Sequence, residues 1–206
     1  MDETGQQQWF SSLKKELEEA YLQHDEPWKQ SGFSGPEERW KAYRKPIADC
    51  IEKSGSFLDI GCANGYLIEC ILKWTAERNI NLIPYGIDLS EKLVELAKKR
   101  LPVYKHNLYT GNGWSWNNQI RFDYVRTEIV YVPEELRRQY VERIIEKYLA
   151  DEGHLLLAEY RNSRDPADLP WLRQTLEKWG LKPERYTSGI YDDKELTRVW
   201  VIKKHR

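Results

Sequence analysis

The chain has 206 residues, of which 40% are hydrophobic and 32% charged, and its formal net charge is −1. This length and balance predict one compact globular domain, and they exclude a protein that binds nucleic acid or anionic membranes through bulk charge. No apolar run approaches the ~20 residues that a membrane span needs. The opening residues Met1-Asp2-Glu3-Thr4 lack the basic and apolar regions of a signal peptide, so we expect a cytoplasmic protein.

The first 50 or so residues predict two helices joined by a loop. Apolar and aromatic residues recur at helical spacing in two stripes, which are Phe10, Leu13, Leu17, Ala20 and Tyr21, and then Trp40, Tyr43, Ile47 and Ile51. The loop between them combines glycines with Trp28 and Phe33, which is the composition of a lid over a binding site. Simple cover for a sheet edge explains these helices equally well. We therefore expect a helical cap over residues 1–50, with Trp28 as a candidate substrate-binding residue.

A buried strand and a glycine-spaced turn come next. Phe57 to Ile60 is an apolar run around Asp59, and apolar residues at helical spacing follow the turn. Gly61 and Gly65 lack a Cβ where the backbone turns sharply and approaches a ligand. Asp59 supplies a fixed hydrogen-bond acceptor at the end of the strand. This segment predicts a strand, a ligand-binding turn and a helix.

A second carboxylate stands at the spacing typical of nucleoside-binding sites. The strand-like run from Ile83 to Ile87 ends in Asp88, 23 positions after Gly65. An acid about 20 residues beyond a glycine turn is the usual partner of a ribose diol. The turn reads Asp-x-Gly-x-x-x-Gly and lacks the middle glycine of a dinucleotide fingerprint. Its carboxylate would repel a pyrophosphate and suits a ligand with a positively charged amino group.

The rest of the chain alternates strands and helices, as in an α/β protein. It predicts a helix capped by Ser90, two strands, a helix opened by Pro133, an apolar fifth strand, a helix that ends at Gly180 and a closing hairpin. The turn residues of the hairpin are Gly189 and Asp192-Asp193. The predicted ranges, in chain order, are 91–100, 107–110, 121–126, a helix from 133, 154–160, 168–179, 182–188 and 197–203.

At residues 56–160 the chain resembles the class I S-adenosylmethionine-dependent methyltransferases. Asp59, Gly61 and Gly65 match the motif that holds the methionine half of the cofactor in that family, and Asp88 matches its ribose-binding acid. The resemblance implies an α/β fold with a doubly wound, mostly parallel seven-stranded sheet, an antiparallel closing hairpin and, here, an N-terminal helical cap. It also implies two parts, a cap or lid over residues 1–50 and a cofactor-binding domain over residues 51–206.

The resemblance places the cofactor S-adenosyl-L-methionine at the carboxyl ends of the strands, where ligands bind in open parallel sheets. The expected cofactor-binding residues are Asp59, Gly61, Cys62, Ala63, Gly65, Asp88, Leu89, Asn112, Gly113 and Thr127. Asn112 stands where the family often has an acid, and its amide oxygen can still accept from the adenine amino group. The three cysteines and four histidines have no metal-ligand spacing, so we expect no metal.

The expected reaction is methyl transfer to a small-molecule acceptor by in-line displacement, which depends on close alignment of nucleophile and methyl group. A hydroxyl or ammonium acceptor needs a base. The expected catalytic residues are Glu128 and Tyr131, the expected substrate-binding residues are Trp28, Glu128 and Tyr160, and further candidate bases are Glu159, His24 and Tyr21. Glu128 has an alternative role as an acid that stabilises a helix start. Arg126 and Arg161 either bind an acidic group of the substrate or pair with neighbouring acids.

Two other kinds of function stay open. The first is methylation of RNA or protein, although the fourth strand is followed by Thr127-Glu128-Ile129 and not by the [DN]-P-P-[YF] motif of enzymes that methylate base amino groups. The second is a module that binds the cofactor without turnover. The sequence leaves the acceptor undefined and allows a monomer or a homodimer.

Overall fold

The computed structural model describes residues 2–162, 164–166 and 168–204. Its α-helices are α1 (Glu3–Tyr21), α2 (Glu37–Asp49), α3 (Tyr66–Ala76), α4 (Glu91–Arg100), α5 (Arg137–Lys147) and α6 (Arg173–Lys178). Its strands are β1 (Gly55–Ile60), β2 (Leu82–Asp88), β3 (Leu108–Thr110), β4 (Phe122–Thr127), β5 (Leu149–Tyr160), β6 (Arg185–Tyr191) and β7 (Lys194–Lys203). Short 3₁₀ turns occupy Lys29–Ser31, Pro102–Asn107, Ile129–Tyr131 and Glu134–Leu136.

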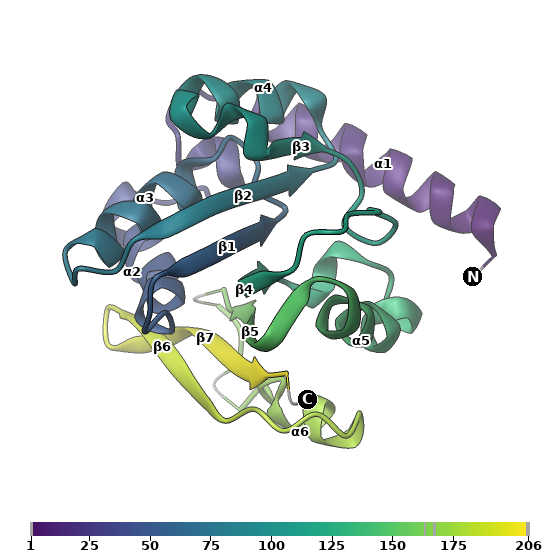
Figure 1. Ribbon diagram of the computed structural model, residues 1–206, viewed down its shortest axis with the longest axis vertical. Coiled ribbons are helices and arrows are strands. Elements are labelled where there is room, and N and C mark those ends of the chain that lie inside the picture. The colour runs from purple at the N-terminus through teal and green to yellow at the C-terminus, as the bar shows by residue number, and fades with distance from the viewer. Residues whose placement is uncertain (1, 163, 167, 205–206) are drawn as a thin grey trace.

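The strands form one sheet in the order β3-β2-β1-β4-β5-β7-β6 (Figure 1). Five neighbouring strands, β3 to β5 in that order, run parallel, and β7 is antiparallel to both β5 and β6. This confirms the predicted doubly wound sheet with its antiparallel closing hairpin. The chain extends the sheet in opposite directions on the two sides of β1, so the switch point, where ligands bind in such sheets, lies at the carboxyl end of β1.

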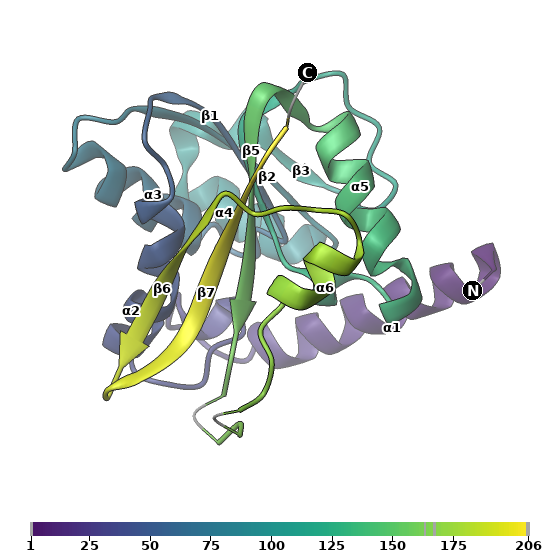
Figure 2. The ribbon, with the colours of Figure 1, turned by 90° about the horizontal axis from the view of Figure 1, so that it is seen from below.

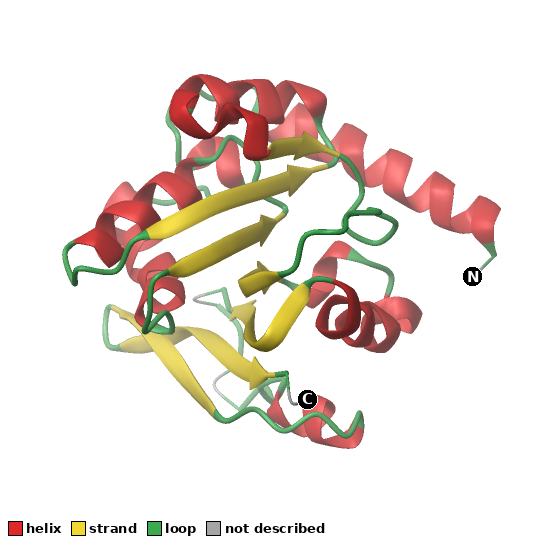
Figure 3. Ribbon diagram, viewed as in Figure 1, coloured by secondary structure: helices red, strands yellow, loops and turns green. Residues whose placement is uncertain are grey.

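Alternating side chains of β1 supply the cores on the two faces of the sheet. Phe57 packs with residues of α2, α3 and α4, whereas Leu58 and Ile60 pack with residues of α5 and α6. Figure 3 shows these helices in red on both sides of the yellow sheet. α1 belongs to neither layer, because it crosses the carboxyl edge of the sheet beyond the arrowhead of β5 (Figure 2). Phe10 is the one buried residue of α1.

Gly189 is not a turn residue, contrary to the prediction, but lies inside β6. Asp192 and Asp193, both with positive φ, make the turn to β7 instead. A Cβ on Gly189 would lie 2.5 Å from the carbonyl oxygen of Ala42 in α2 and 3.2 Å from the ring of Pro46. Pro46 has no N–H, so it makes no helical hydrogen bond to the carbonyl of Ala42 one turn earlier in α2. The glycine therefore lets α2 pack directly on the strand.

Other predicted boundaries also shift. The helix expected at 168–179 covers only Arg173–Lys178, because Pro170 disfavours helical backbone at the residue before it. The fifth strand begins at Leu149 and not at His154, and its register against β4 shifts between these two residues. The helix expected from Pro133 starts as a 3₁₀ turn and becomes α5 at Arg137. Within the described residues, no helix is both long enough and apolar enough to cross a membrane.

Candidate functional site

The turn after β1 is built from residues in the left-handed region of backbone space. Gly61, Ala63 and Gly65 have φ values of +80°, +45° and +76°. A Cβ on Gly61 would lie 2.6 Å from the ring of Tyr131, and one on Gly65 would lie 3.0 Å from Cβ of Ala97 in α4. Both glycines are therefore needed for conformation and for space. Gly61 faces the site, whereas Gly65 permits close packing of α3 against α4.

Asp88 joins this turn to the following helix. Its Oδ2 accepts a hydrogen bond from the backbone N–H of Ala63, and its Oδ1 accepts one from that of Ser90, each at 2.9 Å. The side chain is buried, which raises the pKa of its carboxyl group, while the two backbone donors oppose that shift. An ionised carboxylate has about four acceptor positions, so Asp88 retains capacity for a ligand.

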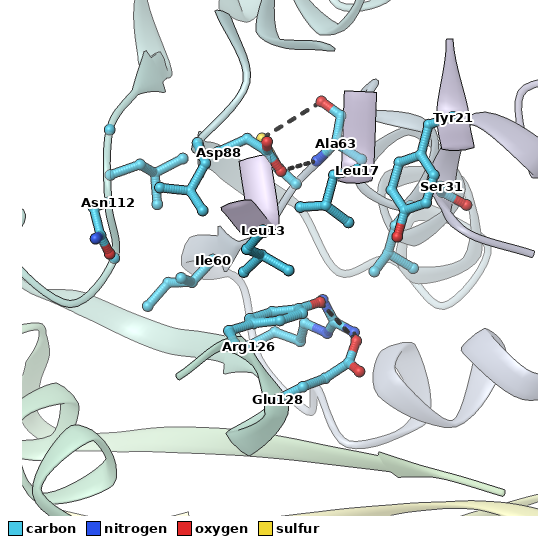
Figure 4. Close-up of a pocket in the computed structure, with 18 of the residues that line it drawn as sticks. Leu13, Leu17, Tyr21, Ser31, Ile60, Ala63, Asp88, Asn112, Arg126 and Glu128 are labelled. Carbon is cyan, nitrogen blue, oxygen red and sulfur yellow. Dashed lines mark hydrogen bonds and ion pairs between the residues drawn. The ribbon is translucent and has the colours of Figure 1, made fainter. Parts of the chain in front are cut away.

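A cavity of about 790 Å³, including space open to solvent, lies at the carboxyl edge of the sheet (Figure 4). The predicted site residues that line it are Gly61, Cys62, Ala63, Asp88, Leu89, Asn112, Gly113, Glu128 and Tyr131. Figure 4 shows α1 residues Leu13, Leu17 and Tyr21 on the same cavity. Arg44 and Tyr140 also line it, and the sequence analysis did not assign them to the site.

Five other predicted binding residues lie outside this lining: Asp59, Gly65, Thr127, Trp28 and Tyr160. Asp59 is fully buried behind the cavity wall. Thr127 is also fully buried, and its hydroxyl lies 2.7 Å from that of Tyr140, which does face the cavity. Trp28 is absent from the lining and donates from its indole nitrogen to the carbonyl of Gly35 at 3.0 Å. Its immediate role is therefore to close the loop that precedes α2.

Tyr160 and Glu159 are adjacent on β5 but face different surroundings. Tyr160 lines a second cavity, of about 1180 Å³ including open space, which shares Tyr21, Glu128 and other residues with the first. Glu159 instead accepts hydrogen bonds from the N–H of Leu172 and the indole of Trp200. These hydrogen bonds hold the carboxylate of Glu159 away from the cavities, so Glu159 is a poor candidate for a base.

A buried ionic network lies beneath the two cavities and centres on Arg126. Asp59 and Arg126 are register partners on the neighbouring parallel strands β1 and β4, and the guanidinium donates to Asp59 at 3.2 Å. It also donates to the carboxylate of Glu128 and to the hydroxyl groups of Tyr131 and Tyr160. Arg126 therefore pairs with neighbouring acids, which is one of the two roles expected from the sequence.

Glu128 is held at one oxygen only. Its Oε1 accepts from Arg126 and, at 2.7 Å, from the hydroxyl of Tyr131, whereas no described residue donates to Oε2. Burial raises the pKa of Tyr131 well above its ordinary value, against the opposing charge of Arg126. Tyr131 thus remains a protonated donor at neutral pH, and Glu128 keeps an oxygen available for a further hydrogen bond.

Asp59 gives the network a predicted pH dependence. Burial raises the pKa of its carboxyl group from 3.8 to about 6, although Arg126 acts in the opposite direction. Because the folded protein then binds more protons than the unfolded chain, stability from this group falls as pH rises from about 4 to about 6. The fall is about 1.4 kcal/mol for each unit of the pKa difference.

In Asp59→Asn this dependence is removed. We expect the free energy of unfolding of the wild type, relative to that of Asp59→Asn, to decrease between about pH 4 and about pH 6 and to stay constant above. Urea unfolding of both proteins at several pH values measures this difference. A difference that does not change across the window would contradict the raised pKa.

Metal and thiol chemistry have little support at this site. Among the described parts of the chain, no group of three or more His, Cys, Asp or Glu side chains is arranged to hold a metal ion. The three cysteines are free and buried. Burial also raises the pKa of the Cys62 thiol, which disfavours a reactive thiolate in the glycine turn.

Comparison with known proteins gives matches only among solved structures. No protein-family model and no curated protein sequence matches the chain. A Burkholderia thailandensis 1,6-didemethyltoxoflavin-N1-methyltransferase with bound 1,6-didemethyltoxoflavin and S-adenosylhomocysteine is 12% identical, with a TM-score of 0.70 over 98% of this chain and 91% of that one. A Synechocystis magnesium protoporphyrin IX methyltransferase with bound S-adenosylmethionine is 14% identical, with a TM-score of 0.64 over 95% and 96%.

A methylase of ribosomal protein L11 from Lactobacillus delbrueckii has the same fold. It is 14% identical, with a TM-score of 0.57 over 84% of this chain and 81% of that one. Together these structures show that the chain has the fold of class I S-adenosylmethionine-dependent methyltransferases. At such low identity the likeness concerns the fold, and the acceptors of these proteins differ from one another.

Proposed function

We propose that the protein is an enzyme that transfers a methyl group from S-adenosyl-L-methionine to a small-molecule acceptor. The observation that carries the proposal is Asp88, a buried carboxylate on the wall of a cavity at the switch point of a methyltransferase fold. Asp88 also fixes the glycine turn through the N–H of Ala63. Fold, cavity and carboxylate together suit a nucleoside ligand that carries a positive charge.

The lining of the first cavity, which Asp88 faces and which we call the inner cavity, fits this cofactor. Asp88 has free acceptor capacity for the ribose hydroxyl groups, and the apolar side chains of Ile60 and Leu89 provide surface for an adenine ring. Gly113 has no room for a side chain, because a Cβ there would lie 2.4 Å from Cγ2 of Ile60. Asn112 would meet the adenine edge. Its Oδ1 already accepts from the N–H of Trp114, and its Nδ2 can donate to a ring nitrogen.

The turn that follows β1 would hold the methionine half of the cofactor. Gly61, Cys62 and Ala63 face the cavity, and Asp59, Gly65 and Thr127 support that wall from behind. When bound, the cofactor supplies an activated methyl group on a sulfonium.

Glu128 is the proposed general base, and Tyr131 positions it. The hydrogen bonds from Arg126 and Tyr131 fix one carboxylate oxygen, so the other can accept a proton from an acceptor hydroxyl or ammonium group. Tyr160 lines the adjoining cavity, where the acceptor would lie. Trp28 would act indirectly, by shaping the loop around Gly35. Methyl transfer then depends on how closely these groups align the acceptor.

The position of α1 supports a small acceptor over a macromolecule. Leu13, Leu17 and Tyr21 line both cavities, so the helix covers the site that an RNA or protein segment would have to enter. A neighbour with a bound small substrate is compatible with this proposal. The ribosomal protein methylase among the neighbours keeps a protein substrate as the alternative. The cytoplasmic location and the monomeric or homodimeric state remain predictions from the sequence.

Titration calorimetry tests the cofactor directly. We expect the purified protein to bind S-adenosylmethionine and S-adenosylhomocysteine, and to give no heat with NAD. Binding of NAD alone would overturn the proposal. Incubation with labelled S-adenosylmethionine and a metabolite extract, followed by identification of the labelled product, then distinguishes an enzyme from a binding module.

The division of the chain into a cap of residues 1–50 and a domain of residues 51–206 remains a proposal, and α1 is its testable part. α2 contributes Trp40 and Ile47 to the core, whereas Phe10 is the one buried residue of α1. Glu18 accepts hydrogen bonds from the hydroxyl of Ser90 and the ammonium of Lys92, each at 2.8 Å. These contacts attach α1 to the start of α4.

Removal of residues 1–22 should therefore leave a folded core that binds the cofactor more weakly and transfers no methyl group. The truncation spares Gln30 and the carbonyl of Pro27, which accept from the buried amide of Asn64. Circular dichroism, cofactor titration and turnover are measured on the same protein. Full turnover by the truncated protein would refute a lid role for α1, and loss of folding would identify α1 as structural cover.

A further inference from the structure

The second cavity, which Tyr160 lines and which we call the outer cavity, has an unusual balance of charge. Its charged side chains within the described part of the chain are Arg39, Arg44, Arg161 and Glu128. Arg126 beneath Glu128 donates to the carboxylates of both Glu128 and Asp59, so it compensates part of the charge of Glu128. The three arginines of the cavity wall thus leave it with a net positive charge.

None of these three arginines has a described acid as its partner. Arg39 and Arg44 take part in no hydrogen bond or ion pair with residues 2–162, 164–166 or 168–204. Instead, Arg39 stacks over the ring of Phe33 at 5.0 Å, and Arg44 over the ring of Tyr160 at 3.7 Å. Arg161 lies 3.6 Å above the ring of Trp171 and donates to a backbone carbonyl. These contacts with aromatic rings hold each guanidinium group beside the cavity without using its hydrogen-bond donors.

Arg44 gives the strongest evidence for a ligand in this cavity. It lines both cavities, and its Nη1 is buried without a hydrogen-bond partner among the described residues. The Nε atoms of Arg39 and Arg161 are in the same condition. A buried donor without a partner costs about 1–3 kcal/mol. Unpaired Nε atoms also occur on Arg137 and Arg143 away from the cavities, and Arg44 differs from these in its position at the wall of both cavities, where a small shift lets a ligand accept from it.

We propose that the methyl acceptor is a small aromatic molecule with a carboxylate or phosphate group, and that Arg44, with Arg39 and Arg161, binds this oxyanion in the outer cavity. Guanidinium groups match both oxyanions in geometry and in charge. Tyr43, Phe33 and Tyr160 provide aromatic surface beside them. The nucleophilic atom would point to Glu128, at the junction of the two cavities. This inference rests on the proposed function, and it adds the chemical class of the acceptor.

The experiment compares an acid with its neutral counterpart. Protein saturated with S-adenosylhomocysteine is titrated with 4-hydroxybenzoate, 4-hydroxybenzamide and phenyl phosphate. We expect the two anions to bind at least about tenfold more tightly than the amide, which corresponds to ~1.4 kcal/mol. Tighter binding of phenyl phosphate than of 4-hydroxybenzoate would identify phosphate as the preferred oxyanion, and the reverse would identify a carboxylate.

Variants on α2 test whether Arg44 and Arg39 cause this preference for anions. Arg44→Gln and Arg39→Gln should reduce the preference for the anions over the amide. Lys45→Gln is the control, because it removes the same charge from the next position of the same helix, where Lys45 is exposed and pairs with Asp49. Its preference should equal that of the wild type. Unfolding curves confirm that each variant is folded.

Equal binding of acid and amide, or binding of none of the anions, would overturn the inference, as would an Arg44→Gln variant that keeps the full preference. If S-adenosylhomocysteine itself fails to bind, the proposed function is rejected. The same three probes are then titrated into the protein alone, where their order of affinity still decides whether the outer cavity selects anions.

Discussion

Asp88→Asn should lower the affinity for S-adenosylmethionine at least about tenfold, or ~1.4 kcal/mol. The carboxylate is the proposed acceptor for the ribose hydroxyl groups, and hydrogen bonds to a charged group contribute about 1.5–3 kcal/mol each. The amide also turns an NH₂ group towards one of the two backbone donors, at Ala63 or Ser90. We therefore expect stability to fall as well, by about 1–3 kcal/mol. Calorimetric titration well below the unfolding temperature measures the affinity.

Asp123→Asn is the matched control for this variant. Asp123 lies on β4 of the same sheet, and its Oδ2 accepts from both the backbone N–H and the hydroxyl of Ser56, at 2.7 and 2.8 Å. It is absent from the lining of both cavities. The control should lose some stability and no cofactor affinity. An unchanged dissociation constant in folded Asp88→Asn would show that Asp88 serves only to tie the turn to α4.

Arg126→Met should lower the free energy of unfolding by about 3–5 kcal/mol, because it leaves the carboxylate of Asp59 buried without its partner. Asp59 is fully buried and Arg126 is 2% exposed, so both charges are largely shielded from water. Glu128 loses one of its two donors in the same variant and keeps only the hydroxyl of Tyr131, so we expect turnover to fall together with stability. Urea unfolding measures the first effect.

Two further variants separate the ionic contribution from the loss of packing. Combining Arg126→Met with Asp59→Asn removes the unpaired charge and should recover part of the lost stability. Arg138→Met removes an arginine whose ion pair with Glu142 is exposed, and it should change stability by less than about 1 kcal/mol. Equal effects of Arg126→Met and Arg138→Met would mean that the buried network contributes nothing particular.

The parts of the site that the sequence predicts are those set by local geometry. The glycine turn is readable because positive φ values at Gly61 and Gly65 need a residue without Cβ. Asp88 is readable because it ends a strand at a fixed spacing from the turn. The succession of strands and helices along the chain follows from the regular alternation of apolar runs and helical stripes, whereas the seven-stranded sheet is implied by the family resemblance. Each of these signals lies within a short stretch of chain.

The parts that the sequence does not predict depend on contacts between distant segments. The pairing of Asp59 with Arg126 follows from the register of β1 against β4, which no local pattern specifies. Gly189 has the composition signal of a turn, but its role is to admit α2. Arg44 resembles any polar residue of an amphipathic helix until Tyr160 is placed beneath it. An aromatic loop residue such as Trp28 gives no local sign of whether it binds a ligand or packs.

The attachment of α1 has a consequence for the order of events in turnover. Ser90 donates to Asp88 through its backbone N–H and to Glu18 of α1 through its hydroxyl, so one residue connects α1 to the proposed ribose-binding acid. Leu13 and Leu17 line both cavities, so a single displacement of α1 uncovers both. Methylated product and spent cofactor would then escape during the same opening. We expect their release rates to be equal and to slow in parallel as solvent viscosity is raised.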